Sequence, residues 1–452
     1  MTSGLTETWN RLRVEDPWSA RAWVALVVTV AFTVVERFLF VFHFSPPSRA
    51  VSSDMAGYVD RAWRLASGAQ LNRFDTFFPP GTHLLMTPAM WIAGDKDRGL
   101  ILNQYLWWFL AVGTALVVAE LAWQLFHHPV PVVLSLWGLY AHQAFQQYAG
   151  FFLSELPFSF FMACTVVAGM VAARQPPSRS RVLWYALTGV LGGVAMVIRP
   201  QFVLTAGVMG LPLLMRQFPF VRWREACALV GALVVSPLLA MTLNARAAGE
   251  YVGLATNGGF NFYQGHCPVD VVETRTSHGV YIWGSPARLQ RLQREGRLET
   301  RTVIQGHMAW ENDYFIREGL ECIRRDGWGH LDRVVGNVAD FFHTTSPWPG
   351  SASHVGPLLL MVNQIYCFAL LCSVIAALFV VRRRKPERLL LMLLCTALPV
   401  ALIFYGDSRF RIPYDMFGVV LTSGLLALRF GFRRDDVGAA SEQGDQSALP
   451  TS

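Results

Sequence analysis

Ten continuous apolar runs, each of about membrane-spanning length, constrain this chain more than any other feature. A helix needs about 20 mostly apolar residues to cross a hydrocarbon core about 30 Å thick. Apolar residues make up 53% of the chain and charged residues 15%, where soluble chains carry about 25% charged residues. The sequence therefore predicts an all-α polytopic membrane protein with about ten transmembrane helices, and it excludes a disordered chain, a disulfide-stapled miniprotein and a collagen-like fibre. The runs cover residues 22–44, 100–126, 131–148, 151–173, 182–198, 201–215, 226–244, 356–381, 389–405 and 412–430.

The positions of the arginines along the chain explain the net charge of +7. With the N-terminus in the cytoplasm, arginine-rich segments such as Arg382–Lys385 and Arg433–Arg434 fall on the cytoplasmic side. Basic residues near the spans are retained on that side of a membrane. We therefore expect both termini in the cytoplasm, with anionic lipid rather than nucleic acid as the partner of the excess charge.

The spans divide the chain into segments with different expected roles. Two long segments, 45–99 and 245–355, lie on the outer face, and loops of this length are usually functional. In the first, an amphipathic stretch precedes an apolar segment, Phe77–Gly94, that is short and broken by two prolines. Such a segment fits a re-entrant or juxtamembrane element. The predicted segments are a cytoplasmic N-terminus (1–21), an N-terminal membrane module (22–244), an extracytoplasmic domain (245–355), C-terminal transmembrane helices (356–430) and a disordered cytoplasmic tail (431–452).

Five of the seven cysteines lie in or beside apolar runs, where a thiol behaves as a small hydrophobe. Cys267 and Cys322 are the two in the outer domain. They face a compartment in which disulfides form, and the sequence leaves open whether they are bonded. No Cys/His cluster has zinc spacing.

Ionisable residues gather at the outer ends of the spans. Charges at membrane depth are costly and tend to face a cavity, whereas a lone interfacial Arg or Asp most often snorkels or caps a helix. Carboxylates and arginines together suit a reaction on a phosphate-bearing lipid, because arginine binds phosphate in a bidentate manner and a carboxylate accepts a proton. The candidates are Asp54, Glu155, Arg199, Arg409, Arg411 and Asp415. Deeper in the first span, Glu36 and Arg37 are adjacent and should point about 100° apart, so we expect each to have another partner.

Several of these residues lie in motifs that resemble the integral-membrane glycosyltransferases of the GT-C fold. The similarity is greatest to bacterial relatives of the protein mannosyltransferases and of the lipid A aminoarabinose transferase. The resembling segments are Ser52-Ser53-Asp54, Phe77-Phe78-Pro79-Pro80-Gly81, Ser154-Glu155, Arg199-Pro200, Asn257–Gly265 and Arg409-Phe410-Arg411-Ile412-Pro413.

The resemblance implies transfer of a sugar from a polyprenyl-phosphate-linked donor to an acceptor hydroxyl, with inversion, on the extracytoplasmic face. Asp54 would be the general base, and Arg199, Arg409 and Arg411 would bind the donor phosphate. Glu155 would orient an arginine or bind a sugar hydroxyl. The remaining candidate substrate-binding residues are Tyr58, His83, Asn257, Asn261 and Tyr263, and His343 and His354 are further candidate contacts.

The chain departs from the family pattern at two positions. Phe78 stands where some relatives have a lysine before the two prolines, so this loop lacks a lysine partner for the donor phosphate. Asp54 is single where the protein mannosyltransferases have an Asp-Glu pair. Glycolipid, polysaccharide and protein acceptors therefore all stay open. No cofactor is predicted, and a divalent metal is left open because no ligand set is visible.

Two other classes of protein fit the same composition. A flippase or transporter of lipid-linked sugars would need a polar pathway through the spans, and a lipid-binding scaffold would need no reactive site. The arginine-rich chain, with lysine only at Lys96 and Lys385, favours a bacterial protein, so the expected location is the bacterial plasma membrane.

Overall fold

The computed structural model is predominantly helical. It describes residues 17–49, 51–52, 54–214, 222–267, 271–276, 279–283, 301–308, 311–342, 357–380 and 385–430. Within these ranges, six helices are long and apolar enough to cross a membrane. The fold is therefore that of a polytopic membrane protein, as the apolar runs predict. The tail 431–452 and the candidate residues His343 and His354 lie outside the described residues.

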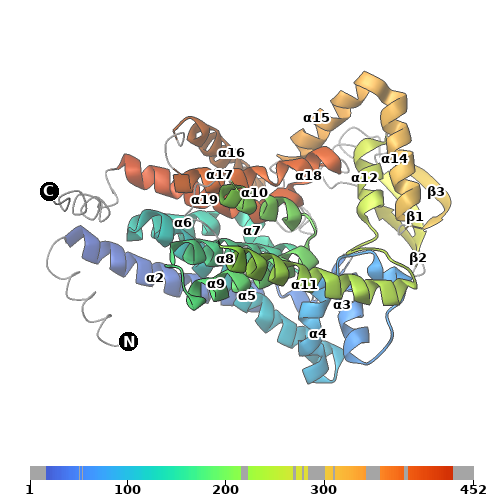
Figure 1. The fold of residues 1–452 in the computed structure, drawn as a ribbon, viewed down its shortest axis with the longest axis horizontal. Coiled ribbons are helices and arrows are strands. Elements are labelled where there is room, and N and C mark those ends of the chain that lie inside the picture. Colours follow the sequence, from blue (N-terminus) through green and yellow to red (C-terminus); the bar gives the residue numbers. More distant parts are fainter. Residues whose placement is uncertain are drawn as a thin grey trace, which may run out of the picture.

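The main bundle consists of long helices that run roughly parallel to one another (Figure 1). Its elements are α2 (Pro17–Leu39) with the π-helical η1 (Phe40–Phe44), α5 (Lys96–Phe126), α6 (Pro129–Ala141), α8 (Glu155–Arg174), α9 (Arg179–Ile198), α10 (Phe202–Leu214), α11 (Trp223–Ala248), α16 (Pro357–Val380), α17 (Lys385–Cys395), α18 (Leu398–Ile403) and α19 (Ser408–Arg429).

Each predicted apolar run coincides with one of these elements, but not every run is one unbroken span. The run 131–148 is interrupted at His142, between α6 and α7 (Gln143–Gln147). The run 389–405 is divided between α17 and α18, and α10 has only 13 residues. Six unbroken spans rather than ten are therefore evident in the described part of the chain.

The segment 45–99, predicted as an outer loop, contains two short helices. An amphipathic helix, α3 (Asp54–Ala66), packs against α4 (Gly81–Ala93), which begins directly after Pro79-Pro80. The short elements around them are η2 (Pro47–Arg49), η3 (Arg73–Thr76) and, before α8, η4 (Tyr148–Gly150). A Cβ atom at Gly81 would lie 2.5 Å from the backbone nitrogen of Ile198, so glycine lets α4 approach the end of α9. This contact brings the Pro-Pro element beside Arg199.

The segment between α11 and α16 forms a layer over one end of the bundle (Figure 1). It contains α12 (Gly258–His266), β1 (Val271–Thr276), β2 (Gly279–Trp283), β3 (Arg301–Met308), α14 (Asn312–Asp326), η5 (Gly327–Gly329) and α15 (His330–Phe341). The strands form a small sheet of order β2-β1-β3, with β1 antiparallel to β2 and parallel to β3. Sequence analysis did not predict this sheet.

A disulfide and the hydrogen bonds of two buried side chains, His266 and Asn337, hold the layer together and to the bundle. Cys267 and Cys322 are joined by the disulfide, which ties the end of α12 to α14. His266 Nε2 donates to the Ile403 carbonyl oxygen at 2.8 Å, so its Nδ1 accepts from His330 Nε2 at 2.9 Å. Asn337 Nδ2 donates to the carbonyl oxygens of Gly265 at 2.9 Å and Phe404 at 3.3 Å. The end of α18 is thus fixed by α12 and α15.

The core of the bundle lies between α5, α8 and α19. One expectation about its charged residues is wrong. Glu36 and Arg37 pair with each other, Arg37 Nε lying 3.4 Å from Glu36 Oε2. Adjacent Cβ atoms diverge, but both side chains are long and flexible enough to bend together, and pairing lowers the cost of charge at membrane depth.

Candidate functional site

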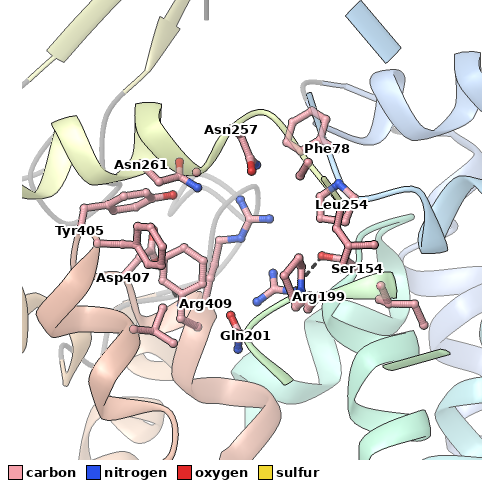
Figure 2. Close-up of a pocket in the computed structure, with 18 of the residues that line it drawn as sticks. Phe78, Ser154, Arg199, Gln201, Leu254, Asn257, Asn261, Tyr405, Asp407 and Arg409 are labelled. Atoms are coloured by element: carbon pink, nitrogen blue, oxygen red, sulfur yellow. Dashed lines mark hydrogen bonds between the residues drawn. The ribbon is translucent and has the colours of Figure 1, made fainter. Parts of the chain in front are cut away.

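A pocket of about 630 Å³ lies where the bundle meets the α12–α15 layer. The polar side chains around it come from residues at or next to helix ends. Asp54 is the first residue of α3, Arg199 follows the last residue of α9, and Arg409 is the second residue of α19. Because these helix ends meet at one end of the bundle, residues far apart in the chain come together (Figure 2).

Glu155 connects the two arginines of the pocket. It is the first residue of α8 and is 0% exposed. Arg199 Nη2 and Arg409 Nε each donate to Glu155 Oε1 at 2.6 Å. Arg199 Nε also donates to Ser154 Oγ at 2.9 Å. A buried carboxylate between two guanidinium groups neutralises part of their mutual repulsion and holds both in one orientation.

Asp54 joins this network from the start of α3. Arg409 Nη1 donates to Asp54 Oδ2 at 3.1 Å, so a single guanidinium links Asp54 and Glu155. Asp54 lines the pocket, whereas Glu155 lies behind it. Asp54 is therefore the carboxylate of the pair that a bound molecule can reach.

A third carboxylate, Asp407, lines the pocket just before α19. Asp407 caps the helix, accepting from the Arg409 backbone N–H at 2.9 Å. Burial raises the pKa of Asp407 to about 6, against the lowering effect of the Arg409 charge. The Asp407 side chain therefore gains or loses a proton in the physiological range.

The wall opposite the arginines carries neutral polar groups. Asn257 and Asn261, at the start of α12, face Arg199 and Arg409 across the cavity (Figure 2). The Gly259 N–H donates to Asn312 Oδ1 of α14 at 2.6 Å, which fixes this end of α12. Tyr58 of α3 also lines the pocket, and burial raises the pKa of its hydroxyl to about 12. Amides and a neutral phenol suit a polyhydroxylated ligand, since they both donate and accept hydrogen bonds.

Apolar residues also line the pocket. They include Val203 and Leu204 of α10 and Val400 and Ile403 of α18. Val203 is 57% exposed and Ile403 45% exposed, so the protein itself does not cover this part of the lining.

Other sequence candidates lie away from this pocket. Arg411 Nε donates to Asp415 Oδ2 at 3.2 Å, and His142 Nε2 lies 2.9 Å from the same oxygen, in a separate buried cluster. His83 is buried, and Tyr263 lies in the small core around the disulfide. None of these five residues lines the pocket.

The described residues contain no set of metal ligands. Among the described residues, no three His, Cys, Asp or Glu side chains converge closely enough to hold a metal ion. Asp54 and Asp407 line the pocket and Glu155 lies behind it, and Arg409 occupies the space between Asp54 and Glu155.

Sequence reasoning missed Gln201 and Asp407 as pocket residues. Both follow a recognisable signal. Gln201 comes directly after the Arg199-Pro200 pair, and Asp407-Ser408 is a helix N-cap sequence just before the predicted final span. A residue that directly precedes or follows a site motif at a helix end lies close to the site because it is adjacent in sequence.

Fold and site together define a polytopic membrane protein with a charged pocket at one end of its helical bundle. No family model matches the chain, and no curated protein sequence matches it.

Solved structures of an oligosaccharyltransferase from Archaeoglobus fulgidus show a partial likeness. The AglB enzyme in complex with an inhibitory peptide and a dolichol-phosphate is 13% identical, with a TM-score of 0.46 over 95% of this chain and 52% of that one. The apo form is 13% identical, with a TM-score of 0.47 over 97% and 53%. This chain thus spans about half the length of the archaeal enzyme.

Proposed function

We propose that this protein is a membrane glycosyltransferase of the GT-C type. It transfers a sugar from a polyprenyl-phosphate-linked donor to an acceptor hydroxyl, with inversion at the anomeric carbon, on the extracytoplasmic face of the bacterial plasma membrane. The observation that carries the proposal is the meeting of Asp54, Arg199 and Arg409 in one pocket whose lining also includes exposed apolar residues.

The two arginines fit the role of binding the donor phosphate. Arg199 Nη1 is buried and has no hydrogen-bond partner among the described residues. A buried donor of this kind is costly unless a ligand or water satisfies it. When the bond between the anomeric carbon and the phosphate oxygen breaks, the electron pair stays on that oxygen. Guanidinium groups fixed beside it stabilise the growing negative charge.

Asp54 fits the role of general base. The acceptor oxygen attacks the anomeric carbon from the side opposite the phosphate, and its proton passes to the Asp54 carboxylate. Glu155, lying behind the pocket, is not placed to touch the substrate. Of the two roles predicted for Glu155, the contacts favour orienting the arginines over binding a sugar hydroxyl.

The apolar side of the pocket supports a lipid-linked donor. A polyprenyl chain enters from the bilayer past Val203 and Ile403, which leaves its phosphate near the arginines. Asn257, Asn261 and Tyr58 then lie around the sugar. Arg411, Tyr263 and His83 do not take part in this assignment, because they do not line the pocket.

Replacing Asp54 by asparagine tests the assignment of the base. We expect Asp54→Asn to lower transfer by about 10²–10⁴-fold, the usual contribution of a general base, while donor binding is retained because the arginines stay in place. Purified protein, a radiolabelled polyprenyl-phosphate sugar and its acceptor lipid fraction give both quantities.

Asp60→Asn is the matched control. Asp60 lies on the same helix, is exposed and pairs with Lys96 outside the pocket, so its replacement should leave turnover unchanged. Full turnover by Asp54→Asn would contradict the role of Asp54.

A further inference from the structure

The α15 helix exposes the apolar side chains of Leu331 and Val335, next to the exposed Asp332, and buries the polar side chains of His330, Asn337 and Asp340. Leu331 is 54% exposed and Val335 66% exposed, one turn apart, and Trp328 at the preceding turn is 89% exposed. These three residues form what we call the α15 stripe. Contiguous apolar surface of this kind is unfavourable in water and marks a contact with a partner or a membrane.

The orientation of α15 is fixed by its other face. His330, Asn337 and Asp340 are buried. His330 donates to His266, and Asn337 donates to the carbonyl oxygens of Gly265 and Phe404. Rotation of the helix that hides the stripe would break these buried hydrogen bonds, so the stripe is held outward.

The position of the stripe favours lipid as its partner. α15 packs against α18, on which Leu402 and Ile403 are exposed at the pocket end of the bundle. The α14–α15 hairpin projects sideways from that end, beyond the body of the bundle (Figure 1). The α15 stripe is therefore on a helix that adjoins the exposed apolar residues of α18.

The residues beside the stripe match the chemistry of a membrane surface. Arg324 and Arg325, at the end of α14, are exposed close in sequence to Trp328. Tryptophan concentrates at the level of lipid headgroups, and arginine pairs with headgroup phosphates. We propose that the α15 stripe binds the surface of the bilayer leaflet on the pocket side, as an interfacial helix.

Such binding has a consequence for the pocket. Asn337 and His266 connect α12 and α15 to Ile403 and Phe404, two residues of the pocket lining. A helix seated on the leaflet therefore holds one wall of the pocket at a fixed depth relative to the lipid surface.

Photocrosslinking tests this proposal without depending on the proposed reaction. Benzoylphenylalanine is introduced at Val335 and, in a second variant, at Leu331, and the purified protein is placed in phosphatidylethanolamine and phosphatidylglycerol vesicles and irradiated. Glu321, exposed on the neighbouring helix α14 outside the stripe, is the control position.

We expect phospholipid adducts by mass spectrometry at Val335 and Leu331 and none at Glu321. Adducts to a second copy of the protein, or no lipid adduct at either stripe position, would overturn the proposal. Both variants replace exposed side chains, so retention of the Cys267–Cys322 disulfide and a single peak in size-exclusion chromatography show that they are folded.

Discussion

The arrangement of charge around Glu155 gives this residue a structural role that is separable from chemistry. Glu155→Gln leaves Arg199 and Arg409 close together without the carboxylate that both contact. Removing one partner of a buried ion pair costs about 3–5 kcal/mol, so we expect a clear fall in the unfolding temperature of the purified protein. Thermal unfolding followed by tryptophan fluorescence measures it.

Glu250→Gln provides the comparison for Glu155. Glu250 pairs with Arg73 at 2.5 Å, but both side chains are about half exposed, and exposed pairs contribute little to stability. We expect no measurable change for Glu250→Gln. Equal unfolding temperatures for the two variants would contradict the bridging role of Glu155.

Asp407 predicts a pH dependence for binding of an anionic ligand. Burial raises the pKa of Asp407 to about 6, whereas the ordinary pKa of an aspartate is about 3.9. Between these two pH values the native protein holds a proton on Asp407 that the unfolded chain does not hold. The stability from burying the neutral acid is therefore present at low pH and is lost as the pH rises through about 6. Protonation also removes one negative charge from the pocket.

We therefore expect polyprenyl phosphate to bind more tightly as the pH falls from neutral through about 6. The Asp407→Asn variant, which keeps a helix-capping side chain, should lose this component of the pH dependence. Binding measured by isothermal titration calorimetry across that range checks it, because titration of the ligand's own phosphate affects both proteins alike. Identical pH profiles would contradict the assignment.

Arg411 is a residue whose position in the chain was recognised from the sequence but whose partner was not. The RFRIP motif places Arg409 and Arg411 together in the chain, and both were predicted to bind phosphate. In the structure α19 begins at Ser408, and residues two apart on a helix point about 200° apart. Arg409 consequently faces the pocket and Arg411 turns to Asp415, four residues on, a pairing that helical spacing predicts once the start of the helix is known.

At the scale of secondary-structure elements, the apolar runs predict where helices form, but they do not predict whether each run is one unbroken helix. Every predicted run is helical, but α6 ends at His142, whose ring accepts from the Phe145 backbone N–H at 3.3 Å and starts a new helix. The β1–β3 sheet lies between α12 and α14 and pairs strands across a gap in sequence. Such pairing depends on long-range contacts, which local periodicity does not report.

The joint between α12, α15 and α18 predicts a second pH effect. Burial lowers the pKa of His266 and of His330, and the nearby Arg333 charge acts in the same direction. The hydrogen bond to the Ile403 carbonyl opposes this shift at His266, and Asp326 opposes it at His330. The native state therefore favours the neutral imidazoles. Stability from this joint is present above the ordinary histidine pKa, about 6.5, and is lost as the pH falls below it.

Hydrogen exchange of the backbone amides in residues 403–407 measures that joint. We expect protection to fall as the pH drops below about 6, after correction for the intrinsic exchange rate, because a proton on His266 Nδ1 removes the acceptor for His330. A His266→Gln variant should show no such step. Protection independent of pH in the wild-type protein would contradict the prediction.

At the scale of the whole molecule, the charged residues of the pocket lie at one end of the bundle, and the start of α2 and the end of α19 lie at the other, away from the α12–α15 layer (Figure 1). That the pocket end is extracytoplasmic stays a prediction from the distribution of arginines along the sequence. The apolar runs are enough to predict a membrane-spanning protein. The pocket could not be predicted in the same way, because it forms only when three helix ends that are distant in the sequence come together.

The distribution of polar groups over the whole molecule bears on whether the protein is an enzyme, a transporter or a scaffold. A transporter of lipid-linked sugars needs a polar path through the bundle. In the described part of the chain, the polar groups that line the pocket gather at one end of the bundle instead. An enzyme acting at one surface fits that distribution better.

The most direct measurement of the central claim is the fate of the donor. Purified wild-type protein in lipid vesicles is incubated with a radiolabelled polyprenyl-phosphate sugar and a lipid and polysaccharide extract as acceptor, with Arg409→Ala as the control. We predict that the label leaves the polyprenyl phosphate in the presence of the wild-type protein and stays on it with Arg409→Ala. An intact donor with the wild-type protein, after a panel of hexose and pentose donors, would contradict the assignment as a glycosyltransferase.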